Sequence, residues 1–79
     1  MTEQVVDMTL DCSGLICPMP IVKIAKAIKQ IEQGQILQMI ATDRGAPADM
    51  EAWTRQTGHE LVESEAAGDR FVFLVRRTK

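Results

Sequence analysis

The sequence has little of what secreted, membrane-bound or nucleic-acid-binding proteins carry. Its two cysteines are too few for a secreted disulfide framework. No run reaches the ~18 apolar residues of a membrane-spanning helix, and residues 1–11 lack the basic, apolar and cleavage regions of a signal peptide. The net charge of −2 offers no basic surface for nucleic acid. We therefore expect a cytoplasmic protein without membrane insertion or direct nucleic-acid binding.

Residues that bind metals and cofactors are equally scarce. His59 is the only histidine, and Cys12, Cys17 and His59 lack the spacing of a zinc site. No glycine-rich motif that cradles phosphate occurs. His59 also follows the second predicted helix, away from Cys17, so a Cys-His catalytic pair is not expected. We predict no metal site and no cofactor.

The residues that are present predict one small domain. The chain has 79 residues, 46% of them hydrophobic, which suffices for a single core and makes residues 1–79 one domain. Periods of two and continuous apolar runs indicate strands. Four are expected, at residues 6–11, 35–42, 60–65 and 70–77, the last two joined by a hairpin connection at 66–69. The second strand is the most apolar and should be central.

Two helices are expected between these strands. From Pro18 to Ile31 apolar residues recur every three or four positions, with Gly34 as the predicted stop. Pro47 fits the first turn of a second helix that ends before Gly58. The order βαβαββ predicts an α/β (α+β) two-layer sandwich, a four-stranded mixed sheet with two helices on one face.

The predicted topology brings three segments together. A right-handed crossover through the first helix makes the first two strands parallel, so the segments that follow them leave the same edge of the sheet. Cys17 should therefore meet Asp43, Arg44 and the start of the second helix. Asp43 would raise the pKa of a nearby thiol and Arg44 would lower it. Asp49 is expected to complement the helix N-terminus rather than to act in catalysis.

One thiol stands directly before a proline pair, in Gly14-Leu15-Ile16-Cys17-Pro18-Met19-Pro20. Proline is tolerated in a first helical turn and stiffens it. The unpaired N–H groups of a helix start favour a thiolate, so we expect the pKa of Cys17 to be moderately lowered. This placement indicates a reactive cysteine, and the alternative is a small apolar residue packed under the loop.

The segment Asp11-Cys12-Ser13-Gly14-Leu15-Ile16-Cys17-Pro18-Met19-Pro20 resembles the D-x-x-G-x-x-C-P-x-P signature of the TusA/SirA family of small sulfur-carrier proteins. Asp11, Gly14, Pro18 and Pro20 are the matching motif residues around Cys17. The resemblance spans essentially the whole chain. It implies a sandwich like the C-terminal domain of a bacterial translation initiation factor.

The resemblance also implies a function. Cys17 would take sulfane sulfur as a persulfide or thiosulfonate, which makes the chain a sulfurtransferase of carrier type. The implied partners are a sulfur-donor protein, such as a cysteine desulfurase or a rhodanese-like protein, and an acceptor sulfur-relay protein. Family members serve tRNA thiolation, molybdenum-cofactor supply, thiosulfate handling or sulfur oxidation, and the sequence does not choose among these pathways.

Two other classes of function stay open. Cys12 and Cys17 are separated by a short loop and would serve together in a two-cysteine thiol redox protein, although a cysteine at a strand end is often just buried. A non-catalytic regulatory module would need neither thiol.

The surroundings of Cys17 suggest how a partner would bind. Ile16 and Met19 flank the thiol, and exposed apolar side chains there would let a partner dock and exclude water. Lys23 and Lys26 are expected on the outer face of the first helix. They would meet an acidic patch on a partner, the alternative being a solvated helix face.

Overall fold

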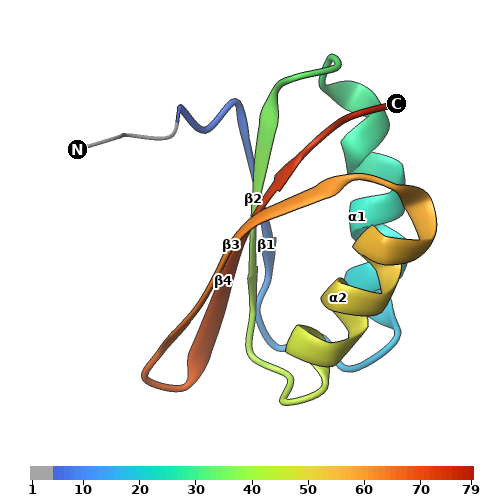
Figure 1. The fold of residues 1–79 in the computed structure, drawn as a ribbon. Coiled ribbons are helices and arrows are strands. Elements are labelled where there is room, and N and C mark those ends of the chain that lie inside the picture. The colour runs from blue at the N-terminus through green and yellow to red at the C-terminus, as the bar shows by residue number, and fades with distance from the viewer. Residues whose placement is uncertain (1–4) are drawn as a thin grey trace.

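The computed structural model describes residues 5–79 and shows a four-stranded sheet with both helices on one face (Figure 1). The elements are β1 (Met8–Cys12), α1 (Met19–Ala27), η1 (Ile28–Gln30), β2 (Ile36–Ala41), α2 (Ala46–Thr57), β3 (Glu60–Ala67) and β4 (Arg70–Arg76). The predicted two-layer sandwich is confirmed; residues 1–4 of the predicted domain lie outside the described residues. Within residues 5–79, no helix is long and apolar enough to cross a membrane.

The sheet has the strand order β1-β2-β4-β3. β1 and β2 are parallel, with Leu10 opposite Met39, as the sequence predicted. β4 pairs antiparallel with both β2 and β3, so β2 is internal, again as predicted. Because β1 and β2 run in the same direction, the segments that follow them leave the sheet at one edge, the lower edge in Figure 1.

The core lies between the sheet and the two helices. Leu37, Met39 and Phe73 from the sheet are fully buried and pack in one cluster with side chains of both helices. From the helices, Ile24 and Met50 are also fully buried. The apolar period of three to four residues thus places one face of each helix on the sheet.

The first helix ends earlier than the sequence predicted. A single 3₁₀ turn follows α1, and Ile31 is already extended, with φ −104° and ψ 165°. Gly34 is not the helix stop; it has φ +88° in a turn that the Gln35 N–H closes onto the Glu32 carbonyl at 3.0 Å. Ile31 is nevertheless buried, so the apolar pattern continues past the end of the helix. Because the apolar pattern continues, the sequence predicted a longer helix than the structure shows.

Candidate functional site

Cys17 lies in the loop between β1 and α1, and its side chain is exposed. Two hydrogen bonds shape the loop: the Ser13 N–H donates to Asp11 Oδ1 at 2.9 Å, and the Gly14 N–H donates to Thr42 Oγ1 at 2.9 Å. Gly14 has φ +80°, a conformation that residues with a side chain rarely adopt. Because Thr42 directly follows β2, the Cys17 loop is tied to the neighbouring loop at the same edge of the sheet.

The start of α1 differs from the arrangement predicted for a thiolate site. Pro18 is the N-cap residue, Pro20 is buried in the first turn, and the Cys17–Pro18 peptide is cis. The Met19 N–H donates to the Ile16 carbonyl at 2.9 Å. This N–H of the helix start is therefore already bonded to the backbone and is not free to face the sulfur.

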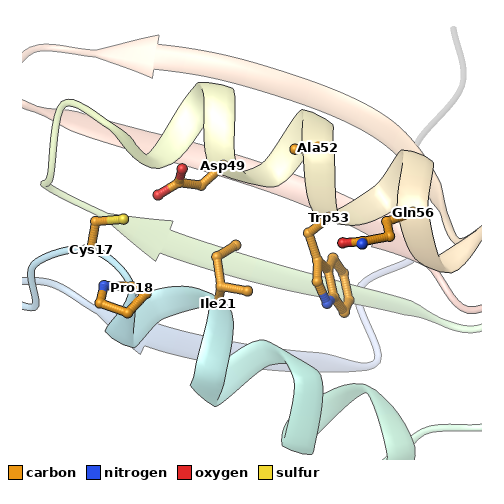
Figure 2. A pocket seen from close by; sticks show the side chains of 7 residues that line it. All are labelled: Cys17, Pro18, Ile21, Asp49, Ala52, Trp53 and Gln56. Carbon is orange, nitrogen blue, oxygen red and sulfur yellow. The ribbon is translucent and has the colours of Figure 1, made fainter.

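The thiol opens onto a groove of about 250 Å³ between α1 and α2 (Figure 2). The groove is lined by Cys17, Pro18, Ile21, Asp49, Ala52, Trp53 and Gln56. Figure 2 shows the sulfur of Cys17 and the carboxylate of Asp49 pointing toward each other from opposite sides of the groove. The walls further along are mostly apolar, so the thiol and this carboxylate are the polar end of the groove.

The electrostatic surroundings raise the pKa of the Cys17 thiol. The largest cause is the hydrogen bond that the thiol donates to the Asp49 carboxylate, followed by desolvation and by the negative charges of Asp49 and Asp43. The predicted lowering of this pKa is therefore wrong. The carboxylates outweigh the helix end, whose Met19 N–H is not available to the sulfur. At neutral pH the group is a thiol rather than a thiolate.

The loop after β2 supplies the second carboxylate. Asp43 lies near Cys17 as predicted, and its Oδ2 accepts the Gly45 N–H at 3.0 Å. The Arg44 side chain is exposed, and it does not reverse the upward shift of the Cys17 pKa.

Sequence reasoning missed the place of Asp49 beside the thiol. Asp49, Trp53 and Gln56 are four and three residues apart, a spacing that puts them on one face of a helix. Since α2 begins at the edge where Cys17 lies, this face borders the thiol. The spacing, joined to the predicted topology, was the available signal.

Cys12 belongs to the core. β1 extends one residue further than predicted, so Met8, Leu10 and Cys12 continue one alternating stripe toward the helices. Cys12 has no exposed surface, and desolvation is the largest cause that raises the pKa of its thiol. Both cysteines are free thiols. The interpretation of Cys12 as a packed core residue fits this position better than a redox role does.

Exposed apolar side chains precede Cys17 and follow it in the first turns of α1. Ile16 is 71% exposed, Met19 42% and Val22 41%. We call these three residues the apolar rim; Val22 was not singled out from the sequence. Lys23 and Lys26 are exposed on α1, as expected.

His59 lies beyond the C-terminal end of α2, whereas Cys17 lies near its beginning. Its ring packs on Trp53 with 5.5 Å between ring centroids, and its Nδ1 accepts the Thr78 N–H at 3.2 Å. In the part of the chain that the structure describes, no cluster of three or more His, Cys, Asp or Glu residues could hold a metal ion.

Comparisons with known proteins concern nearly the whole chain. The family described as Sulfurtransferase TusA matches residues 8–77. The sulfur carrier protein TusA of Allochromatium vinosum is 44% identical over 72 residues, covering 91% of this chain and 95% of that protein. YrkI of Bacillus subtilis, which is also named as a sulfur carrier protein, is 46% identical over 71 residues, covering 90% of this chain and 95% of that protein. The crystal structure of a SirA-like protein from Desulfitobacterium hafniense shares the fold, with TM-score 0.77 and 18% identity, covering 91% of this chain and 99% of that one.

Proposed function

Because this chain belongs to the TusA family of sulfur carrier proteins, we propose that Cys17 takes up sulfane sulfur, as a persulfide or thiosulfonate, and relays it to a partner protein. The observation that carries the proposal is the exposed thiol at the mouth of the groove between α1 and α2 (Figure 2). A thiol that exchanges sulfur with another protein must be reachable, and this one is.

The transfer itself is an exchange of one sulfur–sulfur bond for another. The Cys17 sulfur attacks the terminal sulfur of a donor persulfide, R–S–SH. The donor S–S bond breaks, a new S–S bond forms, and the products are Cys17–S–SH and R–SH. The proton of the Cys17 thiol is balanced by the proton that the departing donor sulfur gains, so no external oxidant or reductant is needed.

The raised pKa of Cys17 suits a carrier that holds its cargo between partners. In delivery, Cys17 is the leaving group, and a leaving thiol with a higher pKa departs more slowly. Asp49 and Asp43 raise that pKa, so they slow the loss of sulfur to adventitious thiols.

The partners we propose are a donor protein, such as a cysteine desulfurase or a rhodanese-like protein, and an acceptor relay protein. The apolar rim gives each of them a surface to cover, and covering it excludes water from the exchange. Lys23 and Lys26 offer positive charge further along α1 for acidic groups of a partner. We place the relay in the cytosol, because an exposed thiol stays reduced there.

The proposal predicts that Cys17→Ala abolishes sulfur uptake. Reduced protein is incubated with a cysteine desulfurase and cysteine, or with tetrathionate, and its intact mass is measured. The native chain should gain one sulfur atom from the desulfurase or one thiosulfonate group from tetrathionate, and Cys17→Ala should gain neither. Cys12→Ala is the matched control and should load like the native chain.

Two outcomes would contradict this function. Sulfur uptake by folded Cys17→Ala would show that the cargo is held elsewhere. Loss of uptake in folded Cys12→Ala, with a Cys12–Cys17 disulfide in the native chain after mild oxidation, would favour the two-cysteine redox function instead.

A further inference from the structure

We propose that Asp49, together with Asp43, makes the Cys17 site selective for sulfur donors that carry a positive charge beside their persulfide. The inference rests on the proposed function and names the class of substrate for it. The groove would then bind a segment of the donor protein in which a lysine or arginine lies next to the persulfide cysteine.

The placement of the two carboxylates is the first argument. Figure 2 shows the Asp49 carboxylate, from the first turn of α2, directed toward the Cys17 sulfur. The Oδ2 atoms of Asp43 and Asp49 lie 3.0 and 3.8 Å from the point that a Cβ on Gly45 would occupy. Both carboxylates are therefore gathered around Gly45, at the end of the groove where the thiol lies.

The charge balance at the thiol is the second argument. Asp49 and Asp43 both act on Cys17 as negative charges, while the Arg44 side chain is exposed. A donor with a cation beside its sulfur is attracted to this site and offsets the charge that disfavours the Cys17 thiolate. A donor with an anion there adds to the repulsion. The sign of the donor's charge therefore affects both the binding of the donor and the attack of Cys17 on its sulfur.

The shape of the groove is the third argument. Pro18, Ile21 and Trp53 line it with apolar surface, and the Asp49 carboxylate lies at the end where Cys17 is. A lysine or arginine side chain matches this arrangement, since its methylene stem packs on apolar surface while its charged end reaches a carboxylate. A purely apolar segment would bring no positive charge to the Asp49 carboxylate.

The test uses three small persulfides of similar size, made from cysteamine, 2-mercaptoethanol and 3-mercaptopropionate. Their side groups are cationic, neutral and anionic. Loading of Cys17 is followed by intact mass at low salt. We expect the cationic donor to load the native chain about fivefold to tenfold faster than the anionic one, and added salt to shrink this ratio.

Asp49→Asn should lower the ratio toward that of a cysteine in a short neutral peptide, while the remaining Asp43 charge keeps part of the preference. Glu32→Gln removes the same charge from the turn before β2, at the opposite end of the sheet, and should keep the native ratio. Each ratio is internal to one variant, so a change in overall reactivity does not alter it. Equal rates in the native chain, or an unchanged ratio in Asp49→Asn, would overturn the selectivity. Loading by none of the three donors would instead contradict the proposed function.

Discussion

The reactivity of Cys17 is decided by the side chains around it more than by the helix that follows it. In the first turn of α1 two prolines have no N–H, and the Met19 N–H is bonded to the Ile16 carbonyl, so the N–H groups near the sulfur are few. The Asp49 carboxylate faces the thiol and is the largest cause of its raised pKa. The pKa of this cysteine therefore depends on the nearby carboxylates and not only on its place before a helix.

This reasoning predicts that Asp49→Asn lowers the pKa of Cys17. The substitution removes the negative charge and weakens the hydrogen bond to the thiol, which are two of the causes that raise the pKa. The rate of alkylation by iodoacetamide, measured against pH, reports the thiolate fraction. The midpoint should shift to lower pH.

Glu51→Gln is the matched control for this measurement. Glu51 lies two residues further along α2, its side chain is exposed, and it pairs with Arg55 at 3.6 Å rather than with the thiol. Its alkylation midpoint should stay at the native value. An unchanged or higher midpoint in Asp49→Asn would show that this carboxylate does not hold the proton on Cys17.

At the scale of elements, the Cys17 loop depends on one glycine in the left-handed region. Gly14 has φ +80°, and its N–H ties the loop to Thr42 beyond β2. Gly34, at the opposite end of the sheet, has φ +88°, and a Cβ at either position would meet nothing within 4 Å. The two glycines therefore have similar backbone conformations and differ in their distance from Cys17, so Gly34 can serve as the control for Gly14.

We predict that Gly14→Ala and Gly34→Ala each lower the free energy of unfolding by about 1–2 kcal/mol, because alanine is strained at positive φ. Chemical denaturation measures this loss. Only Gly14→Ala should also change the rate at which Cys17 is alkylated or loaded with sulfur, since only that loop positions the thiol. Equal reactivity of Cys17 in the two variants would mean that the loop does not need the Gly14 conformation.

Local patterns predicted most elements because each pattern has a direct physical cause. Gly58 ends α2 with φ +88°, and the more continuously apolar strand β2 is internal, both as expected. The errors arose at the ends of elements. Ile31 keeps the apolar period although it is extended, and Cys12 continues the alternation of β1 although a loop was expected to begin there.

At the scale of the whole molecule, the sequence predicted which segments meet at the site, but not that the pKa of Cys17 is raised. Parallel pairing of β1 and β2 placed Cys17 near Asp43, and this follows from topology alone. The direction of the Asp49 side chain depends on how α2 packs against α1. The spacing of Asp49, Trp53 and Gln56 indicates which face of α2 borders the thiol, but it does not show that the carboxylate turns toward the sulfur or that the Met19 N–H is already bonded, and these two facts decide the sign of the pKa shift.

The end of the molecule opposite Cys17 carries a separate response to pH. His59 packs on Trp53, and its pKa is lowered, first by desolvation and then by the positive charges of Arg77 and Lys79. Near pH 6 the unfolded chain therefore binds more protons at this residue than the folded chain does. Linkage then requires that stability is greatest above the ordinary histidine pKa of about 6.5 and falls as the pH drops through that value.

We predict that the free energy of unfolding falls by on the order of 1 kcal/mol or less between about pH 7.5 and about pH 5.5, and that His59→Asn flattens this dependence. Asparagine offers a side-chain oxygen to the Thr78 N–H, which Nδ1 accepts in the native chain, but it does not titrate. Urea denaturation at several pH values measures the slopes. Asp11, whose pKa is lowered, titrates below this window and leaves the comparison intact. Equal slopes in the native chain and His59→Asn would show that the proton is taken up elsewhere.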